Sequence, residues 1–128
     1  MSTPQTDSTI EAPIACDLTA IDAVQRDQHL QTAAHVFRLA VEVTELSNGY
    51  ALRLPNETET FLRAASFIAH ERLCCPFFGF ALEIEPEGGA LWLKLTGRDG
   101  VKLFLQSQLG AHLEPEVARA AQLISELP

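Results

Sequence analysis

The chemistry that this sequence offers is concentrated at the end of one predicted helix, in His70, Glu71, Cys74 and Cys75. Residues four apart on a helix share a face, so His70 lies beside Cys74 and Glu71 beside Cys75. Cys16 precedes another predicted helix and adds a third sulfur if the two helix ends meet. Three thiolates, or two with an imidazole, suit a thiophilic ion such as Zn²⁺, Cu⁺ or Hg²⁺. The pattern therefore predicts a metal site made of these five residues.

Two other interpretations of the cysteines stay open. Buried cysteine often behaves as a small hydrophobic residue, so Cys74 and Cys75 can serve packing alone, in a module that acts by association. The other interpretation is a thiol-dependent redox protein or enzyme. In that case Cys16 or Cys75 is the reactive thiol, and Glu71 or His70 is the base. The negative end of a helix opposes ionisation of a thiol, whereas a bound cation deprotonates it outright. Metal binding therefore ranks above redox chemistry, and no catalytic residue is assigned.

Four short motifs are spread over most of residues 14–105. They are Cys-x-Leu-Thr from Cys16, Asn-Gly-Tyr from Asn48, Glu-Arg-x-Cys-Cys-Pro-Phe from Glu71, and Leu-Thr-Gly from Leu95. Together they resemble a family of small uncharacterised bacterial proteins for which no activity is settled. The resemblance implies a single domain and a loose association with metal handling.

Hydrophobic periodicity predicts the elements that must position these residues. The order is helix, hairpin, helix, hairpin, helix, helix. The predicted helices span residues 19–40, 56–75, 99–110 and 115–127, and the strands lie within residues 41–45, 50–54, 78–85 and 90–96. Thr19 and Asp22 are predicted to cap the first helix.

Two hairpins predict an α+β fold of two layers, with about four antiparallel strands and helices packed on one face. The inward side chains are expected to be Leu52, Leu54, Phe80, Leu82, Leu91 and Leu93. They should meet a helix stripe made of Phe61, Leu62, Ala65, Ile68, Ala69 and Leu73. Trp92 alternates with the inward residues and should lie on the outer face, where it predicts a homodimer.

Length and charge exclude several classes of protein. The chain has 128 residues, which fits one domain at 14–128 after a disordered tail at 1–13. The 9 basic and 17 acidic side chains give a net charge of −8, which argues against binding nucleic acid or anionic membranes. No apolar run reaches the roughly 18 residues of a membrane span. No motif for nucleotide or flavin binding is found.

The start of the chain bears on the state of the cysteines. Residues 1–13 have neither a cationic start nor an apolar core, so they are not expected to be a secretory signal. The cytoplasm is therefore the expected compartment, and all three cysteines are expected there as thiols. A homodimer is the one partner that the sequence predicts.

Overall fold

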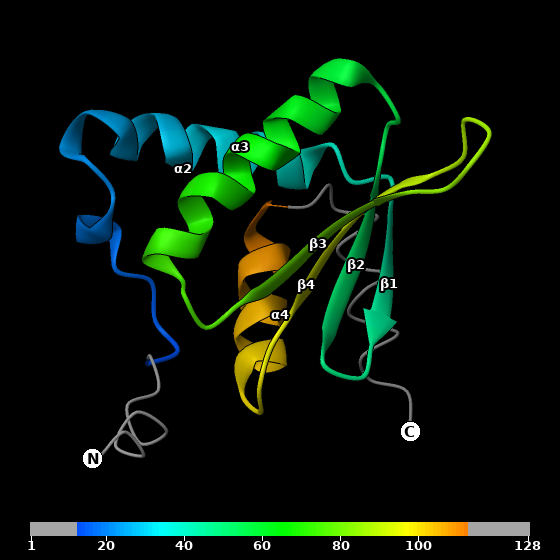
Figure 1. Ribbon diagram of the computed structural model, residues 1–128. Helices are drawn as coiled ribbons and strands as arrows, with labels where there is room; N and C mark the ends of the chain where they lie inside the picture. The colour runs from blue at the N-terminus through cyan, green and yellow to red at the C-terminus, as the bar shows by residue number, and fades with distance from the viewer. Residues whose placement is uncertain (1–12, 113–128) are drawn as a thin grey trace, which may run out of the picture.

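The computed structural model describes residues 13–112, which form a four-stranded antiparallel sheet with helices on one side (Figure 1). The predicted tail, apart from Pro13, and the predicted helix at 115–127 lie outside these residues. The elements are η1 (Leu18–Ala20), α2 (Ala23–Arg38), β1 (Glu42–Leu46), β2 (Gly49–Leu54), α3 (Thr58–Cys74), β3 (Gly79–Ile84), β4 (Leu91–Thr96) and α4 (Val101–His112). The predicted α+β class and the two hairpins are confirmed.

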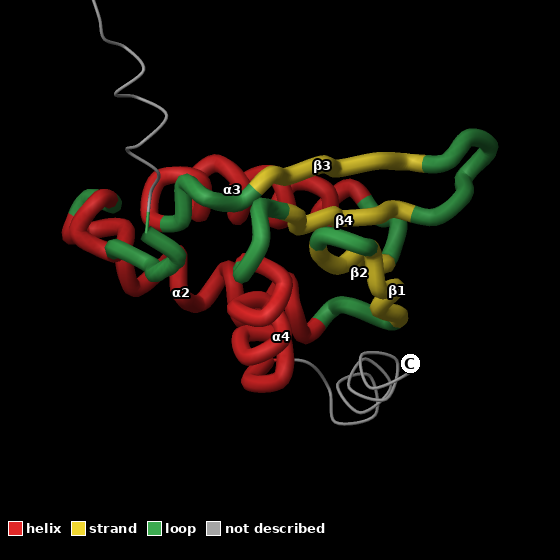
Figure 2. Tube along the Cα trace, turned by 90° about the horizontal axis from the view of Figure 1, so that it is seen from below, coloured by secondary structure: helices red, strands yellow, loops and turns green. Residues whose placement is uncertain are grey.

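The sheet has the strand order β1-β2-β4-β3, so the two hairpins join through β2 and β4. Leu52 pairs with Leu93, which pairs in turn with Leu82 on β3. Leu52 and Leu93 are completely buried, and the same face carries the other predicted inward residues. Figure 2 shows α2 and α4 on this side of the sheet. Burial of this leucine-rich face therefore holds the two layers together.

The outer face carries the alternate residues. Trp92 stands between Arg53 and Glu83 in the register and is half-buried. Lys94 forms an ion pair with Glu83 across the same face, at 3.0 Å. The predicted position of Trp92 is therefore confirmed, and the homodimer stays a prediction.

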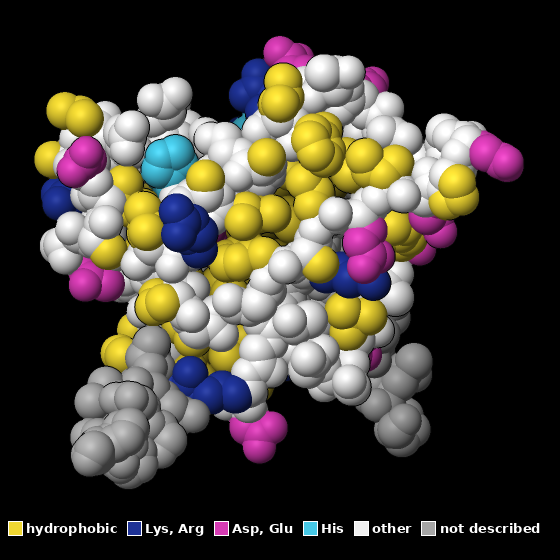
Figure 3. Space-filling view, in the orientation of Figure 1, with side chains coloured by type: hydrophobic (Ala, Val, Ile, Leu, Met, Phe, Trp, Pro, Cys, Tyr) yellow, Lys and Arg dark blue, Asp and Glu magenta, His cyan; other side chains and the backbone are white. Residues whose placement is uncertain are grey.

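The buried face of α3 differs from the predicted stripe. Its buried residues are Thr60, Ala64, Phe67 and Cys74, whereas Leu62 is 59% exposed and Leu73 is 41% exposed. Phe67 is central because its ring meets Phe37 of α2 at 5.4 Å and Phe80 of β3 at 6.3 Å. Ile68 of the predicted stripe packs against the core, but most of the stripe was wrong because α3 has apolar residues on more than one face. Figure 3 shows that hydrophobic side chains which are not part of the buried face are exposed along α3.

The predicted first helix is divided in two. Asp17 caps η1 by accepting a hydrogen bond from the Thr19 backbone N–H at 3.1 Å. The backbone then extends at Ile21, and α2 begins at Ala23. The predicted cap was wrong because Thr19 bonds back to Asp17, and Asp22 makes no side-chain capping bond.

In the range 13–112, no helix is both long enough and apolar enough to cross a bilayer.

Candidate functional site

A backbone hydrogen bond joins the end of α3 to the segment before η1, and a second one closes the last turn of α3. The Asp17 N–H donates to the Cys74 carbonyl oxygen at 2.9 Å, and the Cys75 N–H donates to the Glu71 carbonyl at 2.8 Å. The first bond satisfies a carbonyl that the helix end leaves without an intrahelical partner. It also places Cys16 beside Cys75, with 5.0 Å between their Cα atoms. The expected meeting of Cys16 with the end of the second long helix is confirmed.

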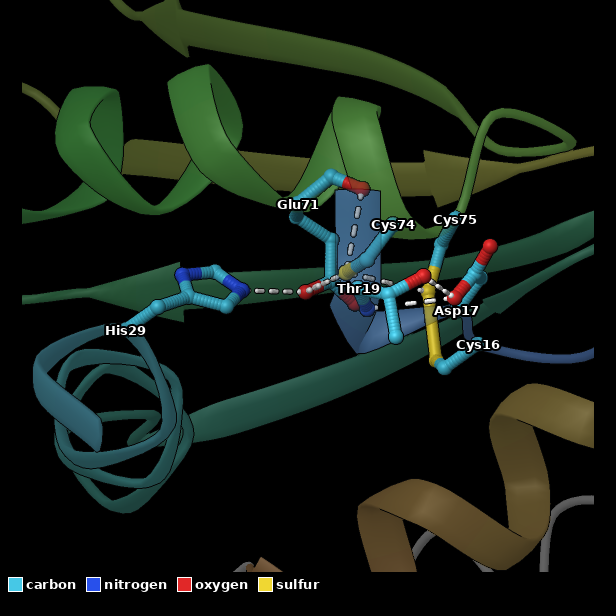
Figure 4. The surroundings of a disulfide bond; sticks show 7 residues. All are labelled: Cys16, Asp17, Thr19, His29, Glu71, Cys74 and Cys75. Carbon is cyan, nitrogen blue, oxygen red and sulfur yellow. Dashed lines mark hydrogen bonds and ion pairs between the residues drawn. A yellow bond between two sulfur atoms is a disulfide. The ribbon is translucent and has the colours of Figure 1, made fainter. Parts of the chain in front are cut away.

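Cys16 and Cys75 form a disulfide (Figure 4). Their Cα separation falls in the usual range for such a bond. The expectation that all three cysteines are thiols was therefore wrong. It rested on the redox state of a compartment, whereas the fold brings these two sulfurs within bonding reach. Cys74 is the free cysteine among the described residues.

Four side chains gather at this point: Cys16, Glu71, Cys74 and Cys75, called here the cysteine–glutamate cluster. Their potential ligand atoms all lie within 4.8 Å of one another. Cys74 and Cys75 are buried, while Cys16 is exposed. Sulfur and carboxylate donors at this spacing can hold a metal ion once the sulfurs are thiolates.

His70 is the predicted ligand that lies outside this cluster. Its Nδ1 donates to the Ser66 carbonyl oxygen one turn earlier in α3, at 3.0 Å. The ring lies beside His29, with 5.8 Å between centroids, rather than beside the sulfurs. The four-residue spacing from His70 to Cys74 therefore does not bring these two side chains into one group.

His29 contacts the site, although its place in the sequence, 42 positions from Glu71, does not mark it as a site residue. It lies on α2, is 4% exposed, and its Nε2 is 2.7 Å from the Glu71 carboxylate. Because the carboxylate accepts, Nε2 carries the proton of this hydrogen bond. The same Glu71 carboxylate oxygen, Oε1, also accepts from the Cys74 thiol at 3.6 Å (Figure 4). His29 therefore orients Glu71 toward the sulfur.

Cys74 is a neutral thiol at ordinary pH. Its side chain is buried, and its sulfur lies 3.6 Å from the Glu71 carboxylate and 3.7 Å from the Cys75 sulfur. Burial and then the negative charge of Glu71 raise the pKa of Cys74 to about 12. Asp17 adds to this effect, since hydrogen bonds from Thr19 lower the pKa of its carboxyl. The same negative charges favour a cation beside the sulfurs.

Sequence reasoning from spacing could reach Glu71, Cys74 and Cys75, but two residues needed the structure. His29 is 42 positions from Glu71, and Asp17 acts through its backbone as well as its carboxylate. No protein-family model, no curated protein and no solved structure matches this chain.

Proposed function

We propose that the reduced protein binds one thiophilic metal ion, of the class Zn²⁺, Cu⁺ or Hg²⁺, for sequestration, delivery or sensing. The Cys16, Cys74 and Cys75 thiolates are the main ligands, and a Glu71 oxygen completes the set. The observation that carries the proposal is the gathering of these four donors within 4.8 Å. Three sulfurs with one oxygen give the four ligands that zinc prefers.

The disulfide makes binding depend on the redox state. It takes up two of the three sulfurs, so the oxidised protein keeps only Cys74 as a thiol ligand. Two electrons and two protons, supplied by a cellular dithiol or glutathione, restore the other two thiols. We place the protein in the cytoplasm, where the cellular dithiols and glutathione can reduce this disulfide and so produce the binding form.

Calorimetric titration tests this function. Reduced protein should bind one Zn²⁺ more tightly than about 10 μM, roughly −7 kcal/mol, and should bind Cu⁺ under anaerobic conditions. The oxidised protein should bind at least about 100-fold more weakly, because two thiolate ligands are missing. Equal affinity of the two forms for Zn²⁺ would contradict the proposed ligands.

Matched variants separate ligands from neighbours in the same titration. Cys16→Ser in the reduced protein should weaken binding, because the third sulfur is lost. His35→Ala should leave it unchanged, since His35 lies on α2 outside the cysteine–glutamate cluster. Binding that survived replacement of both Cys74 and Cys75 would place the metal elsewhere.

Thiol redox chemistry is a second candidate, favoured by the disulfide itself. It requires one fast thiolate, and Cys74 does not meet that requirement with its pKa of about 12. We therefore expect iodoacetamide to alkylate Cys74 of the reduced protein no faster than it alkylates glutathione at pH 7. A reaction at Cys16 faster by tenfold or more would support redox chemistry. Three slow thiols without metal binding would indicate packing alone.

A further inference from the structure

A cavity of about 400 Å³ borders the cysteine–glutamate cluster. It lies among the segment before η1, helix α2, the end of α3, and α4. Cys16, Glu71 and Cys74 line it together with apolar side chains. The apolar part of the lining consists of Ala15, Leu18, Leu30, Ala33, Phe37 and Phe104. Potential metal ligands and apolar side chains therefore line the same cavity, whose apolar part is called the chamber below.

An inorganic ion leaves this chamber unused. Three thiolates and a carboxylate complete the coordination of such an ion without any contact to Leu30 or Phe37. An apolar cavity of about 150 Å³ is enough to hold one benzene, so this one has room for an aryl or alkyl group. The chamber therefore favours a ligand with both a soft centre and an apolar part.

Two of the three cysteine side chains line the cavity. Cys16 and Cys74 border it, whereas Cys75 is absent from the lining. A trivalent metalloid that carries one organic group has two remaining positions for ligands. Two thiolates fill those positions and leave the organic group directed into the chamber.

We infer that the preferred ligand is a thiophilic metal or metalloid centre bearing one apolar organic group, with Cys16 and Cys74 on the centre and the group in the cavity. This rests on the proposed function, whose substrate class it names. For an organic arsenic(III) oxide, two As–S bonds form and the As–O double bond breaks. Both thiol protons pass to the oxygen, which leaves as water, and arsenic stays trivalent. Glu71 is placed to accept the Cys74 proton in transit.

Phenylarsine oxide is the probe, titrated into the reduced full-length chain and compared with arsenite. It should bind one equivalent, at least about tenfold more tightly than arsenite, because the ring is removed from water. Methylarsine oxide, which needs no protein variant, should lie between the two. Cys75→Ser should keep phenylarsine oxide binding and weaken arsenite, since arsenite loses its third sulfur.

A matched pair of variants tests the cavity. Ala33→Phe fills it from α2 and should remove the tenfold advantage of the phenyl compound without changing the affinity for Zn²⁺ or arsenite. Ala69→Phe places the same ring on an exposed position of α3 and should leave the advantage intact. Unchanged Zn²⁺ binding also shows that each variant is folded.

The outcomes separate the two proposals. Zn²⁺ binding with no phenyl advantage, or an advantage that survives Ala33→Phe, overturns the organic ligand and leaves the metal site standing. Failure of Zn²⁺, arsenite and phenylarsine oxide alike overturns the metal site itself. Loss of the advantage in Ala33→Phe alone supports the inference.

Discussion

Replacing Cys16 by serine is expected to lower the free energy of unfolding of the oxidised protein by about 4 kcal/mol. The disulfide joins residues 59 positions apart, so it removes much of the chain entropy of the unfolded state. Few single substitutions have so large an effect on a domain of this size. Urea unfolding followed by circular dichroism, with and without a reductant, measures the difference.

The control for this experiment is Cys74→Ala, which keeps the disulfide. Cys74→Ala should lower the free energy of unfolding by less than Cys16→Ser does. The stability of this variant should still fall when the reductant is added. Cys16→Ser, in contrast, should unfold at the same urea concentration in both conditions. A wild-type protein whose stability did not change on reduction would show that the disulfide contributes nothing to the fold.

Zinc affinity is expected to fall steeply as the pH is lowered, by close to 1,000-fold per unit below about pH 8. Each ligand thiol must lose its proton before it binds. The pKa of Cys74 is raised to about 12, so this thiol is protonated throughout the accessible range. Reduction of the disulfide gives Cys16 and Cys75 one proton each, and these two protons must also leave before the sulfurs bind. Three protons are therefore released for each ion bound.

Calorimetry in two buffers with different ionisation enthalpies counts these protons directly. Cys74→Ser removes one of the three and should reduce the slope to about 100-fold per pH unit. His35→Ala is the matched control and should keep the full slope. An affinity for zinc that did not change between pH 6 and pH 8 would mean that the thiols are not ligands.

The sheet could be predicted because the alternation of apolar and polar residues in its strands fits only one choice of buried face. Leu91, Leu93 and Leu95 alternate with polar or half-exposed residues, and each is completely buried. On α3 the pattern was ambiguous, since Phe61 and Leu62 lie next to the buried Thr60 and near Ala64. The contact of Phe67 with α2 and β3 decides which face is buried, and periodicity within one helix does not contain that contact.

The candidate site was predictable only where its residues are close in the sequence. Glu71, Cys74 and Cys75 lie within five residues at the end of α3, so their short spacing in the sequence predicts that they lie together. Cys16 was included because a helix end was expected near it, but its bond to Cys75 depends on the packing of η1 against α3. The contact from His29 to Glu71 depends on the packing of α2 against α3, and no local pattern marks it.

The most direct test of the central claim is X-ray absorption spectroscopy at the zinc edge, on reduced protein loaded with one equivalent of Zn²⁺. The account predicts three sulfur neighbours at about 2.3 Å and one oxygen at about 2.0–2.2 Å. Cys16→Ser should lower the sulfur count to two. A shell made of nitrogen and oxygen with no sulfur would contradict the proposal that this chain holds a metal ion through its three cysteines.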